Sequence, residues 1–368
     1  MYSADVIELT KKLIGIPSAS GHEAEILFFL KKYFADAVSP FIKRDGKFVA
    51  AKLTGKSSER AFILAGHIDT VVPGDMASWE HSPYEALEKE GKIIGLGASD
   101  MLAGVAANII AASQFKEAEL DYDLWVVATA NEEIDGQGSA DFVQWFKSNT
   151  HYKEVNCIIA EPTNLNQIEI GQRGNRFISL SFHGQSAHGS LQENFDKSAL
   201  SKVTNFLADL DENVAGFSVY RNPILGKPSL VPTGLNAGNP KAPNKTAGRA
   251  DLTIDLRTTP ELEAEFEEVF SNLANKYQFT WKYIASPVMS TLVNPELVFI
   301  QKLSEISNIK KLVASPSSND SGFFEEAGIH TVILGPGDME QAHQANEYVA
   351  IEKIQKFTNI LIDFLRKL

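Results

Sequence analysis

Five short polar segments constrain the fold of this chain most strongly, and four of them directly follow apolar, strand-like runs such as Phe62–Ala65 and Leu124–Thr129. Together they hold two histidines and five acidic residues: His67 with Asp69, Asp100, Glu132 with Glu133, Glu161, and His343. In open α/β sheets, ligands collect at the carboxyl ends of the strands. The sequence therefore predicts side chains of the metal-ligand type gathered at one edge of a central sheet.

Strand-like and helix-like runs alternate in both terminal parts of the chain. Strands are expected at Phe48–Leu53, Ala61–Ala65, Leu124–Thr129, Val155–Ala160 and Thr331–Leu334. Amphipathic or alanine-rich helices are expected between and around them, for example over Met101–Phe115. This alternation is typical of an α/β fold with a mostly parallel sheet flanked by helices.

The pattern changes between Gly171 and about Ser286. Two strand–helix–strand units follow one another there: Arg176–Phe182, 196–210, Ser229–Asn236, then Ala247–Leu256, Pro260–Lys276, Phe279–Ile284. This order predicts an inserted α+β domain of the ferredoxin-like type, with two helices on one face of a small sheet. The expected division is therefore a discontinuous catalytic domain, 1–171 and 286–368, and an insert over 172–285.

Composition limits the classes of binding partner and the cellular compartment that we expect for this chain. The 368 residues are too many for a single core, and the net charge of −13 argues against nucleic acid as a partner. No apolar run approaches the ~20 residues of a membrane span, and no signal-peptide pattern opens the chain. The single cysteine, Cys157, cannot form an intrachain disulfide, which fits a reducing compartment such as the cytoplasm.

The polar segments can be interpreted as one metal site. His67 and Asp69 lie two residues apart in an extended chain, so Asp69 could accept a hydrogen bond from the imidazole ring and fix its tautomer. Asp100 has two oxygens and could bridge two cations about 3.5–4 Å apart. Of Glu132 and Glu133, one could bind metal and the other accept a proton from water. Taken singly, Asp100 could also be only a helix cap, and the two glutamates only an acidic turn.

In their order along the chain, these segments resemble a known family. They look like the two-zinc metallopeptidases and N-deacylases that include acetylornithine deacetylase, succinyl-diaminopimelate desuccinylase, aminoacylase and glutamate carboxypeptidases. The resemblance runs from Leu64–Val71 to Ala342–Tyr348. It implies two zinc ions, with Co²⁺ or Mn²⁺ as alternatives. The implied ligands are His67 and Glu161 for one ion, Glu133 and His343 for the other, and Asp100 as the bridge.

The resemblance also implies catalytic and assembly roles. Glu132 would be the general base, and Asp69 would orient His67. The insert would be a lid and dimerisation domain, which implies a homodimer. His188 in that domain would reach the active site of the partner subunit and stabilise the developing oxyanion.

Substrate binding is implied at a further set of positions. By resemblance, Asn236 and Arg257 would grip the substrate. Together with backbone amides around Gly335 and Gly337, these two side chains could hold its α-carboxylate. The chain departs from the family at Leu102, where relatives often have lysine. It departs again over Ser317–Phe323, where many relatives carry Gly-Gly-Thr-Asp-Gly-Arg, so an anion-recognising arginine would be absent. These departures leave the metal site intact and bear on the choice of substrate.

The sequence therefore predicts a metal-dependent hydrolase that cleaves the amide bond of a small N-acyl amino acid. An acetylornithine-like substrate is favoured, in a role in amino-acid biosynthesis. A dipeptidase or carboxypeptidase would use the same residues and is the main alternative. A non-catalytic protein that keeps metals for stability is the remaining alternative, although the base and all five ligand positions are filled. The acyl group, the side-chain preference and the native metal stay open.

Overall fold

The computed structural model describes residues 2–39, 42–315 and 317–368, and the chain divides into two compact units. The first unit extends to Gly171 and resumes over Val293–Val313 and Asn319–Leu368. The second comprises Gln172–Leu292 and Ala314–Ser318. The insert expected over 172–285 thus lies within the second unit, which continues seven residues further along the chain.

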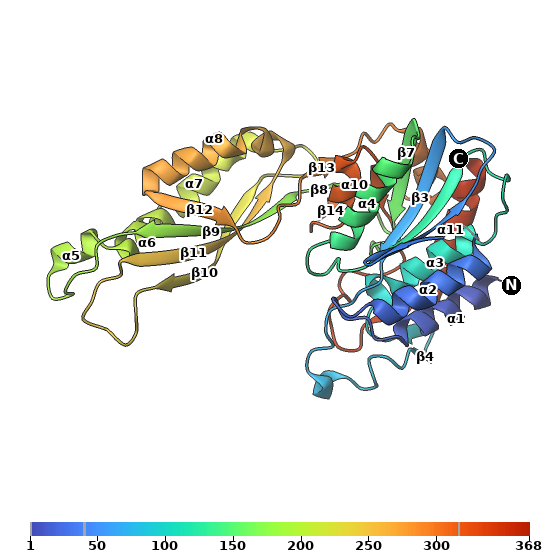
Figure 1. Ribbon diagram of the computed structural model, residues 1–368, viewed down its shortest axis with the longest axis horizontal. Coiled ribbons are helices and arrows are strands. Elements are labelled where there is room, and N and C mark those ends of the chain that lie inside the picture. The colour runs from blue at the N-terminus through green and yellow to red at the C-terminus, as the bar shows by residue number, and fades with distance from the viewer. Residues whose placement is uncertain (1, 40–41, 316) are drawn as a thin grey trace. The chain divides into compact units, whose positions relative to one another are not determined.

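The first unit is built on a large mixed sheet (Figure 1). The strand order is β1 (Ile42–Asp45), β2 (Phe48–Leu53), β6 (Asp123–Thr129), β3 (Arg60–His67), β7 (Glu154–Ile159), β15 (His330–Ile333) and β8 (Ile168–Gln172). The four central strands β6, β3, β7 and β15 pair in parallel, whereas β1, β2 and β8 pair with their neighbours in antiparallel fashion. The predicted mostly parallel sheet is confirmed.

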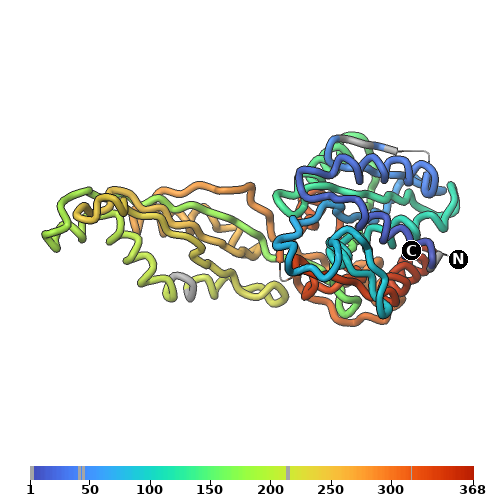
Figure 2. The backbone as a smooth tube through the Cα atoms, turned by 90° about the horizontal axis from the view of Figure 1, so that it is seen from below, coloured from blue at the N-terminus to red at the C-terminus, as the bar shows by residue number. Residues whose placement is uncertain are grey.

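Helices cover both faces of this sheet. On one face, α3 (Ala103–Ala112) packs against α1 (Tyr2–Ile14), α2 (Ala24–Ala37) and α11 (Ile351–Lys367), and α9 (Val298–Ser307) packs on α11. Helices α1 and α11, the blue and red ends of the chain in Figure 2, pack against each other. On the other face lie α4 (Gln137–Asn149) and α10 (Ser321–Glu326).

Buried aromatic side chains hold these layers together. Phe62 on β3 packs edge-on against Phe364 of α11, with ring centroids 5.2 Å apart. Trp125 on β6 points to the opposite face and packs edge-on against Phe146 of α4 at 5.4 Å. Each such pair contributes about 0.5–1.5 kcal/mol beyond the burial of its apolar area. The sheet that carries the candidate site is therefore rigidly supported on both faces.

Several short elements were absent from the sequence-based prediction. Strands β4 (Leu87–Lys89), β5 (Lys92–Ile94) and β16 (Tyr348–Ala350) form a small antiparallel sheet. The helix expected from Met101 begins instead at Ala103, after an irregular turn over Ala98–Leu102 in which Asp100 has extended dihedral angles. The remaining short elements are 3-10 turns at Met76–Ser78 and Phe217–Tyr220 and strands β13 (Thr291–Leu292) and β14 (Leu312–Ser315).

The second unit is an antiparallel sheet of four strands in the order β10-β11-β9-β12. Its elements are β9 (Gly174–His183), α5 (Gln192–Asp196), α6 (Ala199–Ala208), α7 (Leu210–Gly216), β10 (Ser229–Ala237), β11 (Arg249–Thr258), α8 (Pro260–Tyr277) and β12 (Phe279–Tyr283). Buried residues alternate along β11, and its inward side chains join those of α6 and α8 in one core. Sequence order and strand order together are those of the ferredoxin-like fold, which confirms that prediction.

Local sequence explains where the long helix α8 begins. Thr259 precedes it in an extended conformation, and its hydroxyl accepts a hydrogen bond from the N–H of Leu262. Pro260 then occupies the first helical position, where its missing N–H costs nothing. Over the described ranges of the whole chain, no helix is both long and apolar enough to cross a membrane.

Candidate active site

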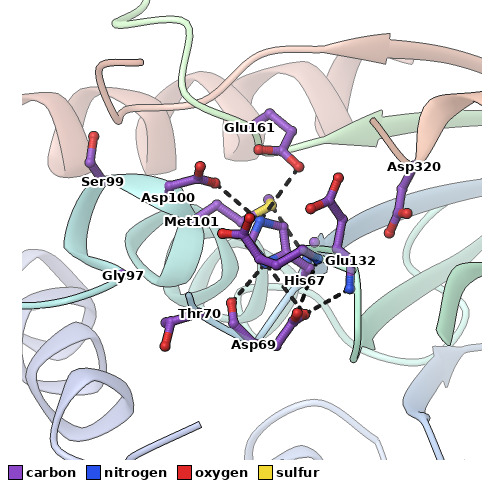
Figure 3. A network of polar contacts seen from close by, with 12 residues as sticks. His67, Asp69, Thr70, Gly97, Ser99, Asp100, Met101, Glu132, Glu161 and Asp320 are labelled. Carbon is purple, nitrogen blue, oxygen red and sulfur yellow. Dashed lines mark hydrogen bonds and ion pairs between the residues drawn. The ribbon is translucent and has the colours of Figure 1, made fainter. Parts of the chain in front are cut away.

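The carboxyl ends of neighbouring parallel strands bring the predicted ligands to one edge of the large sheet (Figure 3). His67 is the last residue of β3. Glu132 and Glu133 lie in the turn after β6, and Glu161 lies two residues beyond the end of β7. Because β3 lies between β6 and β7, the His67 side chain is central among these carboxylates.

Asp100 presents one oxygen to each of two histidines. Its Oδ1 lies 3.0 Å from Nε2 of His67, and its Oδ2 lies 3.6 Å from Nε2 of His343. On the His67 side, Oε1 of Glu161 lies 3.6 Å from the same Nε2 atom. On the His343 side, Oε1 of Glu133 lies 2.9 Å from Nε2. The five side chains thus form two pairs that share Asp100.

This arrangement suits two transition-metal ions. Two atoms bound about 2.1 Å from one tetrahedral zinc lie about 3.4 Å apart, which is close to the separations between these donors. Candidate ligand atoms of His67, Asp100 and Glu133 all lie within 4.8 Å of one another. Imidazole nitrogen and carboxylate oxygen are common zinc donors. We therefore interpret the cluster as a candidate two-metal centre.

The charges in the cluster favour a cation. Burial opposes a positive charge on His67, yet the carboxylates of Glu161 and Asp100 outweigh it and raise the pKa of His67 well above its ordinary value. Hydrogen bonding to Glu133 likewise raises the pKa of His343. Metal binding would displace these protons, because a ligating imidazole must be neutral. The carboxylates therefore favour positive charge in the site in both states: on the protonated imidazoles without metal, and on the metal ions when these are bound.

His67 is oriented by a main-chain group rather than by the expected carboxylate. Its Nδ1 lies 2.9 Å from the carbonyl oxygen of Asp69, whereas the nearest oxygen of the Asp69 side chain is 3.6 Å away. The carbonyl still fixes the tautomer, because it accepts the Nδ1 proton and leaves Nε2 free for a cation. The expected hydrogen bond from the ring to the Asp69 carboxylate is thus corrected to one with the Asp69 carbonyl.

The Asp69 carboxylate instead anchors the turn that follows β6. It accepts hydrogen bonds from the main-chain N–H groups of Glu132 at 3.0 Å and Glu133 at 3.1 Å. Its third donor is the hydroxyl of Ser20, at 2.7 Å. Ser20 lies in the segment before α2, which begins at Ala24. It is thus a supporting residue that connects this segment to the Asp69 carboxylate.

Within the described part of the chain, no hydrogen bond or ion pair joins the Glu132 side chain to a proposed ligand, which leaves it suited to proton transfer. Burial raises the pKa of its carboxyl well above the ordinary value, and the nearby carboxylates of Asp320, Glu133 and Asp100 add to this rise. A raised pKa is typical of carboxyl groups that exchange protons near neutral pH. Bound cations would oppose the rise by stabilising the carboxylate.

Asp320 is a buried acid beside Glu132 that the sequence did not single out (Figure 3). It accepts hydrogen bonds from the hydroxyls of Ser139 and Thr129, both on the elements that flank the site. Burial raises the pKa of Asp320 to about 7. Asp320 lies in the segment Ser317–Phe323, which was compared with the Gly-Gly-Thr-Asp-Gly-Arg motif of relatives, but no role was predicted for it.

The loop over Gly335–Gly337 is packed against the protein. The N–H of Gly335 donates to the hydroxyl of Thr163, so it is not available to a substrate carboxylate as expected. A Cβ atom on Gly335 would lie 2.2 Å from the carbonyl oxygen of Ala160, and one on Gly337 would lie 2.0 Å from that of Ser99. The structure therefore accounts for both glycines by close packing.

The three predicted residues of the second unit do not cluster within it. Asn236 pairs with Asp251, and Arg257 pairs with Ser229, so the two are separated by six positions along β11, or about 20 Å. One chain therefore cannot use both residues to hold a single small carboxylate, which corrects the expectation that they act together. His188 is exposed in the loop after β9, and its ring bonds to Ser190.

Arg257 is already held in a fixed orientation. Its guanidinium forms two hydrogen bonds with the carboxylate of Asp255, at 2.8 and 3.0 Å, and a third with the hydroxyl of Ser318 at 3.3 Å. A paired arginine of this kind is preorganised, because its fork geometry is set before any ligand arrives. This arrangement suits a binding role.

Known proteins share this sequence pattern and this fold. Residues 63–367 match the model of Peptidase family M20/M25/M40. The chain is 26% identical to a succinyl-diaminopimelate desuccinylase of Wolbachia pipientis wMel over 381 residues, covering 98% of this chain and 92% of the relative. It is 27% identical to an acetylornithine deacetylase of Proteus mirabilis (strain HI4320) over 378 residues, covering 95% and 93%.

A solved structure agrees with these relatives. The M20 family metallo-carboxypeptidase Sso-CP2 from Sulfolobus solfataricus superposes with a TM-score of 0.78 at 16% identity, covering 98% of each chain. At that identity the likeness shows the fold alone. The family resemblance seen in the sequence is confirmed by the match over 63–367. The chain belongs to Peptidase family M20/M25/M40 and is a hydrolytic enzyme of a metal-dependent family.

Proposed function

We propose that this enzyme hydrolyses the amide bond of a small N-acyl amino acid, with an acetylornithine-like substrate favoured. The observation that carries this proposal is the pairing of two histidines across the two oxygens of Asp100. Support for the substrate class comes from the desuccinylase and the deacetylase, which match nearly the whole chain. A role in amino-acid biosynthesis and a cytoplasmic location are part of the same proposal.

In the proposed reaction, some residues of the site bind metal and one residue transfers a proton. His67, Glu161, Asp100, Glu133 and His343 would hold two metal ions, with zinc as the first choice. When bound, such ions polarise an amide carbonyl and ease the loss of a proton from water. Glu132 accepts that proton as the water oxygen attacks the carbonyl carbon, and it then delivers the proton to the leaving amine as the C–N bond breaks.

Three residues of the second unit have proposed roles toward the substrate. His188 of one subunit would donate a hydrogen bond to the carbonyl oxygen of substrate bound in the partner subunit, as negative charge develops on that oxygen. Arg257, already aligned by Asp255, would bind a substrate carboxylate. Because Asn236 lies about 20 Å from Arg257 along the same strand, it would act on a different part of the substrate or in the partner subunit's site.

A homodimer through the second unit is proposed on the same basis. Strand β10 lies at one edge of its sheet and exposes Val231 and Leu235. An exposed apolar edge strand is a common site of pairing between chains. Light scattering on the purified protein checks this: we expect twice the 40.4 kDa chain mass, and a single chain mass at micromolar concentration would contradict the dimer.

A peptidase is the second candidate, favoured by the match of residues 63–367 to a peptidase family. The same metal centre and the same base would cleave a peptide bond. The non-catalytic alternative is set aside, because the chain belongs to a family of hydrolytic enzymes.

A substrate panel separates the two candidates. Zinc-loaded protein is assayed against acetylornithine, succinyl-diaminopimelate and several dipeptides, with released amine as the readout. We expect the highest kcat/KM on an N-acyl amino acid. Activity on dipeptides together with none on N-acyl amino acids would replace the first proposal by the second.

A further inference from the structure

Two of the proposed metal ligands lie on segments that the structure fastens together. Asp100 lies in a loop over residues 95–102, which we call the Asp100 loop. His343 lies in a segment over residues 338–347, which we call the His343 segment. Neither residue belongs to a regular strand or helix, so hydrogen bonds must set the distance between them.

Glu347 binds the Asp100 loop at one end of the His343 segment. Its carboxylate accepts three main-chain N–H groups, from Gly97 at 2.9 Å, Ser99 at 2.7 Å and Asp100 itself at 3.0 Å. The Glu347 residue is 1% exposed. Its own carbonyl accepts the N–H of Gly95. A buried carboxylate that receives three amide donors holds their backbone in one geometry.

Ser99 binds the other end of the segment. Its hydroxyl donates to the carbonyl of Asp338 at 2.9 Å and accepts the N–H of Asp338 at 2.7 Å. The adjacent Gly337 packs so closely on the Ser99 carbonyl that no side chain fits there. The Ser99 residue is also 1% exposed. The His343 segment is therefore tied at both ends to the loop that carries Asp100.

We propose that Ser99 and Glu347 are positioning residues, which together form a clamp that sets the separation of two metal ligands. The clamp holds Asp100 and His343 where one cation can reach both. It deepens the proposed function and rests on it, because it assumes that these two residues bind metal. Neither Ser99 nor Glu347 contacts a cation or the substrate in this proposal.

The clamp should affect the two metal positions unequally. His67 is fixed by strand β3, and Glu133 is fixed by the turn bonded to Asp69. His343 has no comparable support from a strand or helix. Loosening the clamp therefore weakens mainly the cation between Glu133 and His343, and weakens the cation beside His67 less.

Metal titration of the Glu347→Gln variant tests this proposal. The amide group keeps one acceptor oxygen but turns an N–H toward an N–H donor of the loop. Metal-free protein is titrated with Zn²⁺ by calorimetry, and with Co²⁺ by visible absorption. We expect one of the two binding constants to fall about 10–100-fold, the usual effect of losing a residue that supports a ligand, and the other to change less. Ser99→Ala should shift the same constant in the same direction by less.

Asp123→Asn is the matched control. Asp123 is a buried carboxylate that accepts the main-chain N–H of Gly55, but it lies at the opposite end of strand β6 from the site. This variant should lose stability without a change in either metal constant. If both metal-binding constants are unchanged in Glu347→Gln and also in Ser99→Ala, the clamp proposal is wrong. A wild-type protein that binds no pair of metal ions would instead overturn the proposed function. If Glu347→Gln does not fold, Ser99→Ala alone decides the outcome.

Discussion

The carboxylate of Asp69 accepts a hydrogen bond of 3.0 Å from the main-chain N–H of Glu132. Its other oxygen accepts the N–H of Glu133, so one buried side chain holds the turn that presents both glutamates. The carbonyl of Asp69 also bonds to the ring of His67. A residue outside the proposed ligand set therefore orients the proposed base and two proposed ligands.

Replacing Asp69 by asparagine should disturb this turn. The new amide group can accept only one of the two N–H groups and places its own N–H against the other. We expect a loss of about 1–3 kcal/mol in the free energy of unfolding, because a buried donor is left unsatisfied. We also expect kcat to fall about 10–100-fold. Urea denaturation and steady-state kinetics measure the two effects.

Ser20→Ala serves as the graded control for Asp69. It removes one neutral donor and leaves both main-chain bonds in place, so its cost should be about 0.5–1.5 kcal/mol, with little change in kcat. An Asp69→Asn variant as active as Ser20→Ala would show that the turn does not depend on this carboxylate.

Glu132→Gln should separate catalysis from metal binding. Glutamine has the size of glutamate but cannot take up a proton, so we expect kcat to fall about 10²–10⁴-fold with unchanged metal content. Metal analysis by mass spectrometry is run beside the turnover assay. Glu133→Gln is the comparison, because the loss of a proposed ligand should reduce the metal content itself. A near-normal rate for Glu132→Gln would rule out its role as the base.

Asp320 should make the stability of the metal-free protein depend on pH. Burial raises its folded-state pKa to about 7, whereas an unfolded aspartate titrates near ~3.9. The folded state therefore holds this proton more tightly, and its contribution to stability is fully present below pH ~4. That contribution decreases as pH rises and is lost as pH passes through about 7.

Asp320→Asn tests this pH dependence. The variant cannot ionise at that position. In the presence of chelator, the unfolding free energy of the wild type should therefore fall relative to that of the variant as the pH rises from 4 to 8. Chemical denaturation across this range gives the difference directly. A difference that stays constant with pH would show that Asp320 does not titrate in this interval.

Chelation should lower both activity and thermal stability. A metal ion that binds only the folded chain stabilises it by about 2.7 kcal/mol when present at 100 times its Kd. Its removal leaves the protonated rings of His67 and His343 as the counter-charge of the Glu161, Asp100 and Glu133 carboxylates. We expect a lower thermal midpoint with EDTA and recovery with Zn²⁺, measured by calorimetry. A thermal midpoint that changes neither with EDTA nor with Zn²⁺ would argue against a metal centre.

Local patterns were sufficient to predict most regular elements. Strand β2 was predicted with the bounds that it has, because Phe48–Leu53 is an apolar run between turn residues. The six main elements of the second unit were each predicted to within a few residues, since their alternation of strand and helix periods is clear. The short strands β4, β5 and β16 were missed, because three residues carry no detectable period.

Contacts between segments that are far apart in the sequence could not be predicted from local patterns. The carboxylate of Glu347 bonds to an amide 250 residues away, and no local pattern marks such a pair. The separation of Asn236 from Arg257 likewise became visible only from the register of β10 on β11. A hydrogen bond to a main-chain amide does not depend on the type of residue that donates it, so the spacing of side chains in the sequence does not predict it.

By itself, the sequence determined the class of fold and the types of donor, because strand periods and the polar residues that end strands are local properties. It thereby placed His67, Glu133 and Glu161 at one edge of a parallel sheet. Only the tertiary structure decided which atoms face one another. It showed that Asp100 lies between two histidines, and that the Asp69 carboxylate bonds to main-chain amides rather than to an imidazole. Those relationships depend on how far-separated loops pack, and packing is a property of the whole folded chain.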